Sequence, residues 1–325
     1  MAIATIRFED CFDALKDIPG QSVDAVITDP PYFLDKMGDN WDKNKLSYLT
    51  KTSRVSSLPA GMKFDPKQGL EFQSFMHQVA IESFRILKPG GFMLAMSSPR
   101  LYHRLGVAIE DAGFEIRDMW AWIYTQNQVK AMSVERFLDK KDLNSTQETV
   151  LRAELASWKT PQVKSLIEPI VFAQKPKDGK TFLDNWLEHH VGLVNVHTGV
   201  GADEDMMTAN VMTTGPINDA YDRAFMVSKP GKKEKGETDH VSVKPLALME
   251  QLIRATVPVD GVVVDPFNGS GSTGIAALNL GRNYLGMEKM PEYYLQSTAR
   301  FTNHFGPAKK ISDGFQVFEN LAADE

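Results

Sequence analysis

Short apolar runs alternate along this chain with longer stretches in which apolar residues recur every three or four positions. The run at 23–28 is mostly apolar or β-branched, which is typical of a short buried strand. Residues 70–87 have helical spacing and precede Pro89, Gly90 and Gly91, which we expect to end the helix. The same patterns predict further strands at 5–8, 92–98, 114–124, 261–265 and 283–288, and helices at 11–18, 100–113, 244–257, after 271 and from 292. Strands that alternate with helices predict an α/β fold with a doubly wound, mostly parallel sheet.

The regular alternation is interrupted between Asn127 and Gly236. The pieces there are short, charged and weakly periodic, although residues 168–176 form one strong apolar run that is a candidate strand of the main sheet. We interpret the interruption as an insertion into a single α/β domain. The predicted division is a first half, an inserted region, a second half and a polar peripheral tail, at 1–126, 127–236, 237–305 and 306–325.

Composition and charge narrow the class of protein. A hydrophobic content of 42% and a charged content of 24% are those of an ordinary globular protein. The sequence has no apolar run of the ~18 residues that a spanning helix needs, and no signal-peptide core, so we expect a cytoplasmic protein without membrane contact. The single cysteine, Cys11, excludes an internal disulfide and a CxxC metal site. The net charge of −6 argues against indiscriminate coating of nucleic acid and leaves a localised basic groove open.

The predicted strand at 23–28 ends at Asp29, Pro30, Pro31 and Tyr32. Ligands of open α/β sheets bind outside the carboxyl ends of the strands, so this is a candidate site. Each proline fixes φ and removes an N–H, so the segment offers a carboxylate, two carbonyls and an aromatic ring without competing donors. These groups suit a flat ring that carries N–H donors. Alone, the segment fits a capped turn equally well.

The predicted strand at 261–265 leads into a glycine-rich loop. Gly269, Gly271 and Gly274 have GxGxxG spacing, and Glu288 ends the next strand, where a carboxylate can accept hydrogen bonds from ribose hydroxyls. A P-loop is excluded because no Gly-Lys-Ser/Thr follows. The intervening Asp265 to Asn268 makes the loop wider than a usual dinucleotide fingerprint, which suits a ligand with an amino-acid end and a nucleoside end.

Together the two motifs resemble those of the β-class, circularly permuted DNA amino-methyltransferases that use S-adenosylmethionine, of the N6-adenine type. The resemblance covers most of Arg7 to Phe301 and is weakest at 127–236. It departs from the family pattern at His240-Val241-Ser242-Val243-Lys244-Pro245 and at Ser272. The resemblance implies a class I methyltransferase Rossmann-like fold, with a catalytic half at 1–126, a target-recognition region at 127–236 and a cofactor-binding half at 237–305.

The resemblance also implies the roles of individual residues. The catalytic segment is Asp29, Pro30, Pro31 and Tyr32, with Asp29 and the Pro30 carbonyl accepting from the amino group of a flipped-out base and Tyr32 stacking on it. S-adenosylmethionine is the methyl donor, no metal is required, and its binding residues are Asp10, Cys11, Asp29, Lys244, Pro245, Asp265, Phe267, Asn268, Gly269, Ser270, Gly271, Thr273, Glu288 and Lys289.

Several of these residues have a purely structural alternative. Asp10 is equally suited to cap the helix at 11–18, Cys11 to be a small buried residue, and Lys244 and Pro245 to begin a helix. His189 and His190 do not share a helix face, so we expect a solvated loop there rather than a metal site. The insert and its border carry basic groups that suit phosphate contacts or plain solvation: Lys159, Lys164, Lys229, Lys232, Lys233 and Lys235.

The resemblance implies double-stranded DNA as the substrate, in a bacterial or phage-encoded context, and leaves open a homodimer and a cognate restriction endonuclease. N4-cytosine methylation on the same scaffold is the near alternative, disfavoured because that activity more often goes with Ser in place of Asp29. RNA or protein amide methylation is disfavoured by the order of the motifs. A non-catalytic nucleic-acid-binding homologue would lack Asp29 or the glycine loop, and an NAD-dependent oxidoreductase would leave Asp29 to Tyr32 without a role.

Overall fold

The structure is a computed structural model that describes residues 1–31, 66–123, 131–161, 165–195, 211–212, 230–231, 234, 243–312 and 314–320. Tyr32, Lys164 and the lysines at 229, 232, 233 and 235 lie outside the described residues. Among the described residues, no helix is both long and apolar enough to cross a membrane.

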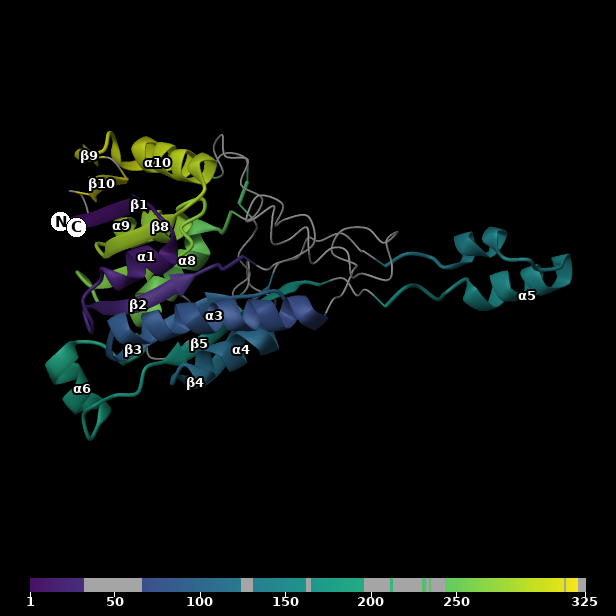
Figure 1. The fold of residues 1–325 in the computed structure, drawn as a ribbon, viewed down its shortest axis with the longest axis horizontal. Helices are drawn as coiled ribbons and strands as arrows, with labels where there is room; N and C mark the ends of the chain where they lie inside the picture. Colours follow the sequence, from purple (N-terminus) through teal and green to yellow (C-terminus); the bar gives the residue numbers. More distant parts are fainter. Residues whose placement is uncertain are drawn as a thin grey trace, which may run out of the picture.

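The strands of the described chain form one ten-stranded sheet (Figure 1). Their bounds are β1 Ala2–Phe8, β2 Val23–Thr28, β3 Leu87–Met96, β4 Glu115–Ile123, β5 Ile167–Gln174, β6 Val211–Met212, β7 Val262–Asp265, β8 Asn283–Glu288, β9 Lys310–Ser312 and β10 Phe315–Asn320. Their order is β6-β4-β5-β3-β2-β7-β8-β1-β10-β9. Neighbours from β3 to β1 pair in parallel, whereas β5 and β10 are each antiparallel to both neighbours. The predicted mostly parallel sheet is confirmed.

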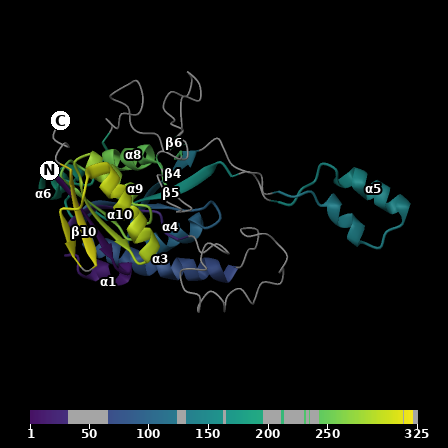
Figure 2. The ribbon, with the colours of Figure 1, turned by 90° about the horizontal axis from the view of Figure 1, so that it is seen from above.

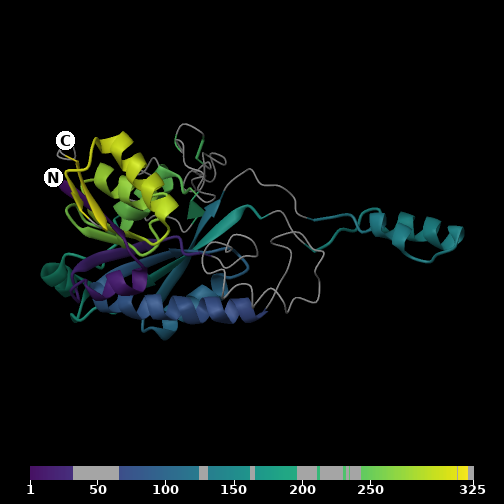
Figure 3. The same ribbon diagram turned by 45° about the horizontal axis from the view of Figure 1, so that its top comes forward.

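Helices cover both faces of the sheet (Figures 1 and 3). The helices of the body are α1 Cys11–Lys16, α3 Pro66–Ile86, α4 Tyr102–Asp111, α6 Phe182–His189, α8 Leu246–Thr256, α9 Ser272–Asn279 and α10 Pro291–Phe305. One core joins α8, α9 and α10 to the sheet, and the other joins α1, α3 and α4 to the opposite face. Ala25 and Ile27 of β2 belong to the first core and Val26 to the second. Burial on both faces explains why this strand is apolar at successive positions.

The chain reverses its direction across the sheet between β2 and β7. From β2 it proceeds to β3 on one side, and from β7 it proceeds to β8 on the other, while β2 and β7 themselves pair in parallel. Open α/β sheets bind ligands at such a switch point, outside the carboxyl ends of the strands. Asp29 follows β2 directly and Asp265 ends β7, so the fold places the two motifs side by side.

The helix ends at Ile86, ahead of Pro89, as expected, but the predicted start of the next strand at Phe92 is wrong. Pro89, Gly90 and Gly91 do not lie in a turn after α3 but within β3, which begins at Leu87, directly after the helix. A β-carbon at Gly91 would lie 2.9 Å from the Lys88 carbonyl oxygen and 3.0 Å from that of Asp24, so close approach of backbone, not a break in the strand, requires glycine here.

The prediction that residues 306–325 form a peripheral polar tail is also wrong. Its described part forms β9 and β10, and β10 pairs along β1 from Ala2–Asn320 to Arg7–Phe315. Phe318 is 1% exposed and its ring centroid lies 5.2 Å from that of Phe301. The segment therefore completes the core beyond β1.

The interrupted region at 127–236 contributes both to the sheet and to a projection from it. The apolar run at 168–176 supplies β5, which lies inside the sheet between β3 and β4. Residues 131–161 contain η2 Glu135–Lys140 and α5 Ser145–Leu155, which lie apart from the body at the end of a long arm (Figures 1 and 2). No residue of α5 is buried, so packing against the body does not hold this helix.

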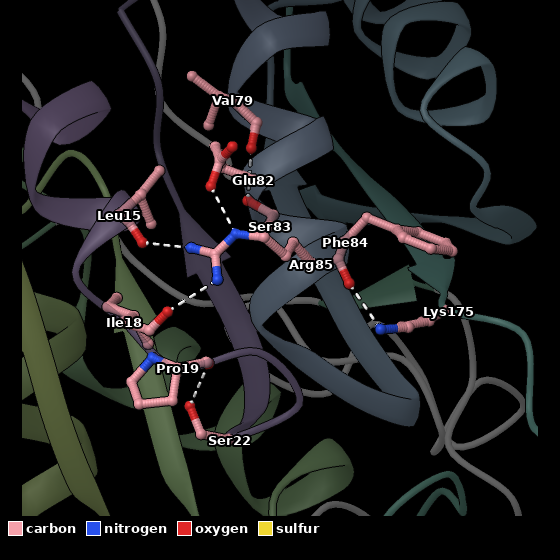
Figure 4. A network of polar contacts seen from close by, with 10 residues as sticks. All are labelled: Leu15, Ile18, Pro19, Ser22, Val79, Glu82, Ser83, Phe84, Arg85 and Lys175. Carbon is pink, nitrogen blue, oxygen red and sulfur yellow. Dashed lines mark hydrogen bonds and ion pairs between the residues drawn. The ribbon is translucent and has the colours of Figure 1, made fainter.

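Charged side chains anchor the ends of the helices that border the site (Figure 4). Arg85, in the last turn of α3, donates from Nη2 to the Leu15 carbonyl at 2.7 Å and from Nη1 to the Ile18 carbonyl at 2.9 Å. Lys175 donates from Nζ to the Phe84 carbonyl at 2.7 Å. Cations are favourable at the carbonyl ends of helices; here Arg85 fixes α1 against α3, and Lys175 fixes the end of α3 to the segment after β5.

Candidate active site

Asp265 is the most enclosed carboxylate of the site, at 2% exposure. Its Oδ1 accepts from the Thr28 hydroxyl at 2.7 Å and from the Phe267 N–H at 3.0 Å, and its Oδ2 accepts from the Thr273 hydroxyl at 2.8 Å. Burial raises the pKa of Asp265 to about 6, although these three donors act in the opposite direction. The hydrogen bonds join the end of β2, the turn after β7 and the start of α9, so Asp265 shapes the loop.

The glycine-rich loop is fastened to the protein behind it. Arg300 is 4% exposed and donates from Nη1 to the Ser270 carbonyl at 2.5 Å. The Tyr284 hydroxyl donates to Oδ1 of Asn268 at 2.9 Å. The side chains of Asn268, Ser270 and Thr273 are all at most 5% exposed. These contacts fix the shape of the loop, and the binding of a cofactor by Asn268, Ser270 and Thr273 stays a prediction.

Gly271 is required by its backbone conformation and by the packing behind it. Its φ of 77° is in the left-handed region, and a β-carbon there would lie 2.8 Å from Cε2 of Phe301 and 3.3 Å from Cβ of Ser297. A side chain at Gly271 would thus collide with α10, and contact of this residue with the cofactor stays a prediction. At Gly274 a β-carbon would lie 2.4 Å from Cε1 of Tyr284, so this glycine permits close packing of α9 on the sheet.

Glu288 closes the loop from the end of β8. Its Oε2 accepts from the Gly269 N–H at 2.9 Å and its Oε1 from the Met290 N–H at 2.8 Å. Burial, together with the nearby charge of Asp265, raises the pKa of Glu288 to about 7, while the two N–H donors lower it. A carboxylate whose pKa lies near 7 is partly ionised at neutral pH. Beside a glycine loop, its ionised form can accept hydrogen bonds from the hydroxyls of a ribose.

A small open pocket lies beside Glu288. Asp10 and Lys289 stand at this pocket as an ion pair, with Nζ 3.2 Å from Oδ2. The other Asp10 oxygen accepts from the Phe12 N–H at 3.0 Å, so the predicted cap of α1 is confirmed, while contact of Asp10 with the cofactor stays a prediction. Burial and the Asp10 charge raise the pKa of Cys11 to about 12, so its thiol stays protonated. The lining residues are Glu9, Asp10, Cys11, Phe75, Pro266, Phe267, Met287, Glu288 and Lys289.

The walls of this pocket are apolar and aromatic. Phe75 of α3 and Phe267 of the loop have ring centroids 5.8 Å apart, and Phe12 packs edge-on against Phe75 at 5.3 Å. Met287 adds an apolar side chain from β8. Flat apolar walls with a carboxylate at one end suit a nucleoside, whose base packs on the rings while its sugar meets Glu288.

Asp29 is paired with a buried lysine. Nζ of Lys244 donates to Oδ2 of Asp29 at 2.5 Å and lies 2.9 Å from Oε1 of Glu168. The Lys244 side chain is 6% exposed. Burial lowers the pKa of Lys244, but the two carboxylates outweigh burial and raise it above its ordinary value. Lys244 therefore stays charged next to the predicted catalytic carboxylate.

The structure brings most of the predicted residues to one edge of the sheet. Asp10, Cys11, Phe267, Glu288 and Lys289 line the pocket. Pro30 is buried and Pro31 half-buried after Asp29, and Pro245 forms the N-cap position of α8, so the helix begins at Leu246. Tyr32 lies outside the described residues.

Sequence reasoning missed four residues that this geometry uses. Glu168, Phe75, Thr28 and Arg300 come from β5, α3, β2 and α10. The helical periodicity identifies Phe75 as apolar without saying that it faces a pocket. An arginine amid the apolar face of α10 is the signal that Arg300 is buried, and no local pattern marks Glu168.

The prediction of a solvated loop is wrong for His189. This residue is the last of α6, and its Nε2 lies 2.9 Å from Oδ2 of Asp178. The ligand atoms of Asp178, Glu188 and His189 lie within 4.8 Å of one another. Asn185 of the same helix donates to the Pro89 carbonyl near the start of β3, which places this group away from the carboxyl edge of the sheet.

Comparison with known proteins gives one family and several relatives. The DNA methylase family of N6 and N4 methyltransferases matches residues 23–299. The Type II methyltransferase M.HindIII of Haemophilus influenzae is 30% identical over 303 residues, covering 88% of this chain and 91% of that protein. M.HinfI of the same species is 27% identical and covers 89% of this chain and 66% of its own length.

Solved structures share the fold at lower identity. The cytosine-N4-specific PvuII DNA methyltransferase has a TM-score of 0.58 at 17% identity, over 96% of this chain and 89% of that one. A Thermus thermophilus protein described as a DNA modification methylase has a TM-score of 0.53 at 20% identity, over 92% and 94% of the two chains. These likenesses support the class I methyltransferase fold.

Proposed function

The chain belongs to the DNA methylase family, and from this premise we propose that it transfers a methyl group to the N6 amino group of adenine in DNA. The methyl donor is S-adenosylmethionine. We infer that the acceptor is an amino group from the position of Asp29. This carboxylate follows β2 at the switch point of the sheet, beside the loop of Asp265. The choice of adenine rests on Asp29 itself, since N4-cytosine enzymes more often have serine at the position that Asp29 matches.

The described residues fit the donor. Phe75, Phe267 and Met287 provide apolar walls for its adenine, and Glu288 can accept from its ribose hydroxyls. The carboxylate of Asp29 complements a positively charged sulfonium and ammonium. When bound, S-adenosylmethionine supplies the methyl group from its sulfonium. The sulfur, which loses its positive charge in the transfer, leaves as a neutral thioether.

The chain's own contribution to the transfer is orientation and charge. The exocyclic nitrogen of adenine is a weak nucleophile because its lone pair is delocalised into the ring. A hydrogen bond from that amino group to Asp29, and a second to the Pro30 carbonyl, favour a pyramidal nitrogen with its lone pair directed at the methyl group. Positive charge then grows on the nitrogen, and a fixed carboxylate stabilises it. Tyr32 is proposed to stack on the base once it has left the duplex.

Product analysis tests this function. The protein is incubated with S-adenosylmethionine and DNA from a methylation-free host, and the digested nucleosides are separated by mass spectrometry. We expect N6-methyldeoxyadenosine. N4-methyldeoxycytidine would overturn the assignment of the base and keep the family, and the absence of any donor-dependent methyl group would overturn the proposal itself. Sequencing the modified positions in the same DNA identifies the recognised site.

We propose further that the part of 127–236 outside the sheet carries target recognition. The arm at 131–161 supports this because it projects from the body (Figure 2) and many of its residues are exposed, Lys159 among them. Lys159→Gln with Lys164→Gln should lower the log–log salt slope of DNA binding by roughly 0.9 for each true phosphate contact. An unchanged slope would mean that both lysines are merely solvated.

A cytoplasmic location stays a prediction from the sequence, and a homodimer and a cognate endonuclease stay predictions from the resemblance. Sedimentation at micromolar concentration tests the dimer.

A further inference from the structure

Lys244 lies between two carboxylates that come from different parts of the fold. Asp29 follows β2, and Glu168 is the second residue of β5. Since β5 runs against its neighbours, its beginning lies at the carboxyl edge of the parallel strands, where the site is. The side chains of Asp29 and Glu168 are 19% and 15% exposed, so bulk water screens this cluster only in part.

The charges of these three groups do not cancel. One ammonium and two carboxylates carry a net charge of −1. Lys244 and Asp29 without Glu168 would form a neutral pair, and a neutral pair stabilises a growing positive charge far less than a carboxylate does. Asp265 lies nearby, but both of its oxygens already accept from Thr28, Phe267 and Thr273, so it does not share the ammonium of Lys244 as Glu168 does. Glu168 therefore restores the negative charge that Lys244 removes.

We propose that Glu168 is a positioning residue for methyl transfer: it shares the ammonium of Lys244, so that Asp29 is held in place by the lysine and yet keeps its negative charge for the substrate. The inference rests on the proposed function of Asp29. Lys244 serves as the tether, because its Nζ is 2.5 Å from Asp29 and 2.9 Å from Glu168. The net charge at the cluster is then that of a single catalytic carboxylate with a fixed orientation.

A merely structural role for Glu168 makes a different prediction from a role in setting charge. If Glu168 only packs, then a second substitution at Lys244 should lower the rate of methyl transfer further. If it offsets the lysine, then removing the lysine from the Glu168 variant returns the net charge to −1 and recovers function. The test is therefore a double-substitution cycle with Glu168→Gln, Lys244→Met and both together, in which the sign of the interaction decides.

Single-turnover methyl transfer, with DNA and S-adenosylmethionine both saturating, is the first measurement. We expect Glu168→Gln to slow transfer by about ten- to a hundred-fold, Lys244→Met to slow it as well, and the double variant to be faster than Glu168→Gln. Glu168→Asp should retain more transfer than Glu168→Gln because it keeps the charge. Glu115→Gln, an exposed carboxylate of β4 whose partner is Arg117, is the matched control and should leave the rate unchanged.

The second measurement does not depend on activity. S-adenosylmethionine and S-adenosylhomocysteine differ by one methyl group and one positive charge, so the ratio of their dissociation constants reports the charge of the site. Calorimetry should show a preference for the charged ligand that falls by about ten-fold in Glu168→Gln and recovers in the double variant. A ratio unchanged in Glu168→Gln, or a double variant slower than both single variants, overturns the inference. If the wild-type protein transfers no methyl group to DNA, the proposed function fails, and the ratio still decides whether Glu168 sets the charge.

Discussion

Two aspartates at the ends of neighbouring strands look alike in the sequence and differ in their surroundings. Asp265 ends β7, is 2% exposed, and accepts from two hydroxyls and one N–H. Asp29 follows β2, is 19% exposed, and pairs with the ammonium of Lys244. Both precede a proline, and both lie at the same switch point of the sheet.

From this difference we predict a structural role for Asp265 and a chemical role for Asp29. Neutral donors hold Asp265 and use both of its oxygens, so its contribution is the shape of the loop. A cation holds Asp29 near the surface of the crevice, where a ligand can reach it. Position after a strand thus selects candidates for a site, while the partners of each carboxylate decide its role.

The largest effect is expected for Asp29→Ala. Methyl transfer should fall by at least about a hundred-fold, the scale of losing one preorganised charge-stabilising group. S-adenosylmethionine and DNA should still bind, because Lys244 keeps Glu168 as a partner in the variant. Single-turnover transfer of labelled methyl groups at saturating ligands separates catalysis from binding. Asp29→Asn, which keeps an acceptor oxygen, should be as slow if charge dominates; near-normal turnover in Asp29→Ala would remove the catalytic role.

Asp265→Ala should affect folding more than catalysis. The substitution leaves the hydroxyls of Thr28 and Thr273 and the N–H of Phe267 without their acceptor in a buried place, so the free energy of unfolding should fall by about 2–3 kcal/mol. Asp265→Asn keeps one oxygen and should cost about 1 kcal/mol. Urea unfolding measures both. If Asp265→Asn unfolds as wild type and yet stops transfer, then the distinction between the two aspartates is wrong.

The ionisation of Glu288 should make both the stability of the protein and its affinity for S-adenosylmethionine depend on pH. Its pKa of about 7 in the free protein lies above the usual 4.5, so stability due to this group is present at low pH and is lost as the pH rises through 7. Binding of S-adenosylmethionine has the opposite sign, since ribose hydroxyls need the ionised carboxylate. We expect affinity to weaken by about ten-fold per unit as the pH falls below 7. Calorimetry at several pH values should show this slope in Glu9→Gln, a pocket-lining control, and not in Glu288→Gln.

The smallest effect is expected at Thr28, whose hydroxyl joins the strand of one aspartate to the carboxylate of the other at 2.7 Å. Thr28→Val keeps the shape of the side chain and removes this hydrogen bond, which should lower the free energy of unfolding by about 1 kcal/mol. Methyl transfer should change by less than about three-fold if Asp29 is held mainly by Lys244. A loss comparable to that of Asp29→Ala would show that the two loops act as one catalytic unit.

Periodicity and local motifs were enough to predict the strands and helices that frame the site. The apolar run before Asp29 and the run before Asp265 each predict a strand, and the alternation between them predicts that these strands share one parallel sheet. The pocket residues near the motifs, Phe267 and Glu288, are correctly expected at the ends of β7 and β8. The identity of the methyl donor came from the resemblance and not from periodicity.

Contacts between segments far apart in the chain could not be read from local patterns. Glu168 meets Lys244 only because β5 enters the sheet against its neighbours, and no pattern around Glu168 encodes that direction. Phe318 is buried because β10 pairs with β1, whereas the polar residues around it suggest a tail. The role of Gly271 depends on the position of Phe301, which packing alone determines.

The placement of β1 has a consequence for how the protein is made. This strand is synthesised before every other strand of the described sheet, yet it pairs with β8 at Ala4–Tyr284 and with β10 at Ala2–Asn320. Both edges of β1 therefore stay unpaired until β8 and β10 have been synthesised. In contrast, β2 and β3 can pair as soon as the intervening helix has emerged. Contacts of such long sequence separation form late and slowly, and an unpaired strand edge invites association with other chains. Among the described strands, β1 has the partners that lie farthest along the sequence, and we expect it to be the strand that most needs protection during synthesis.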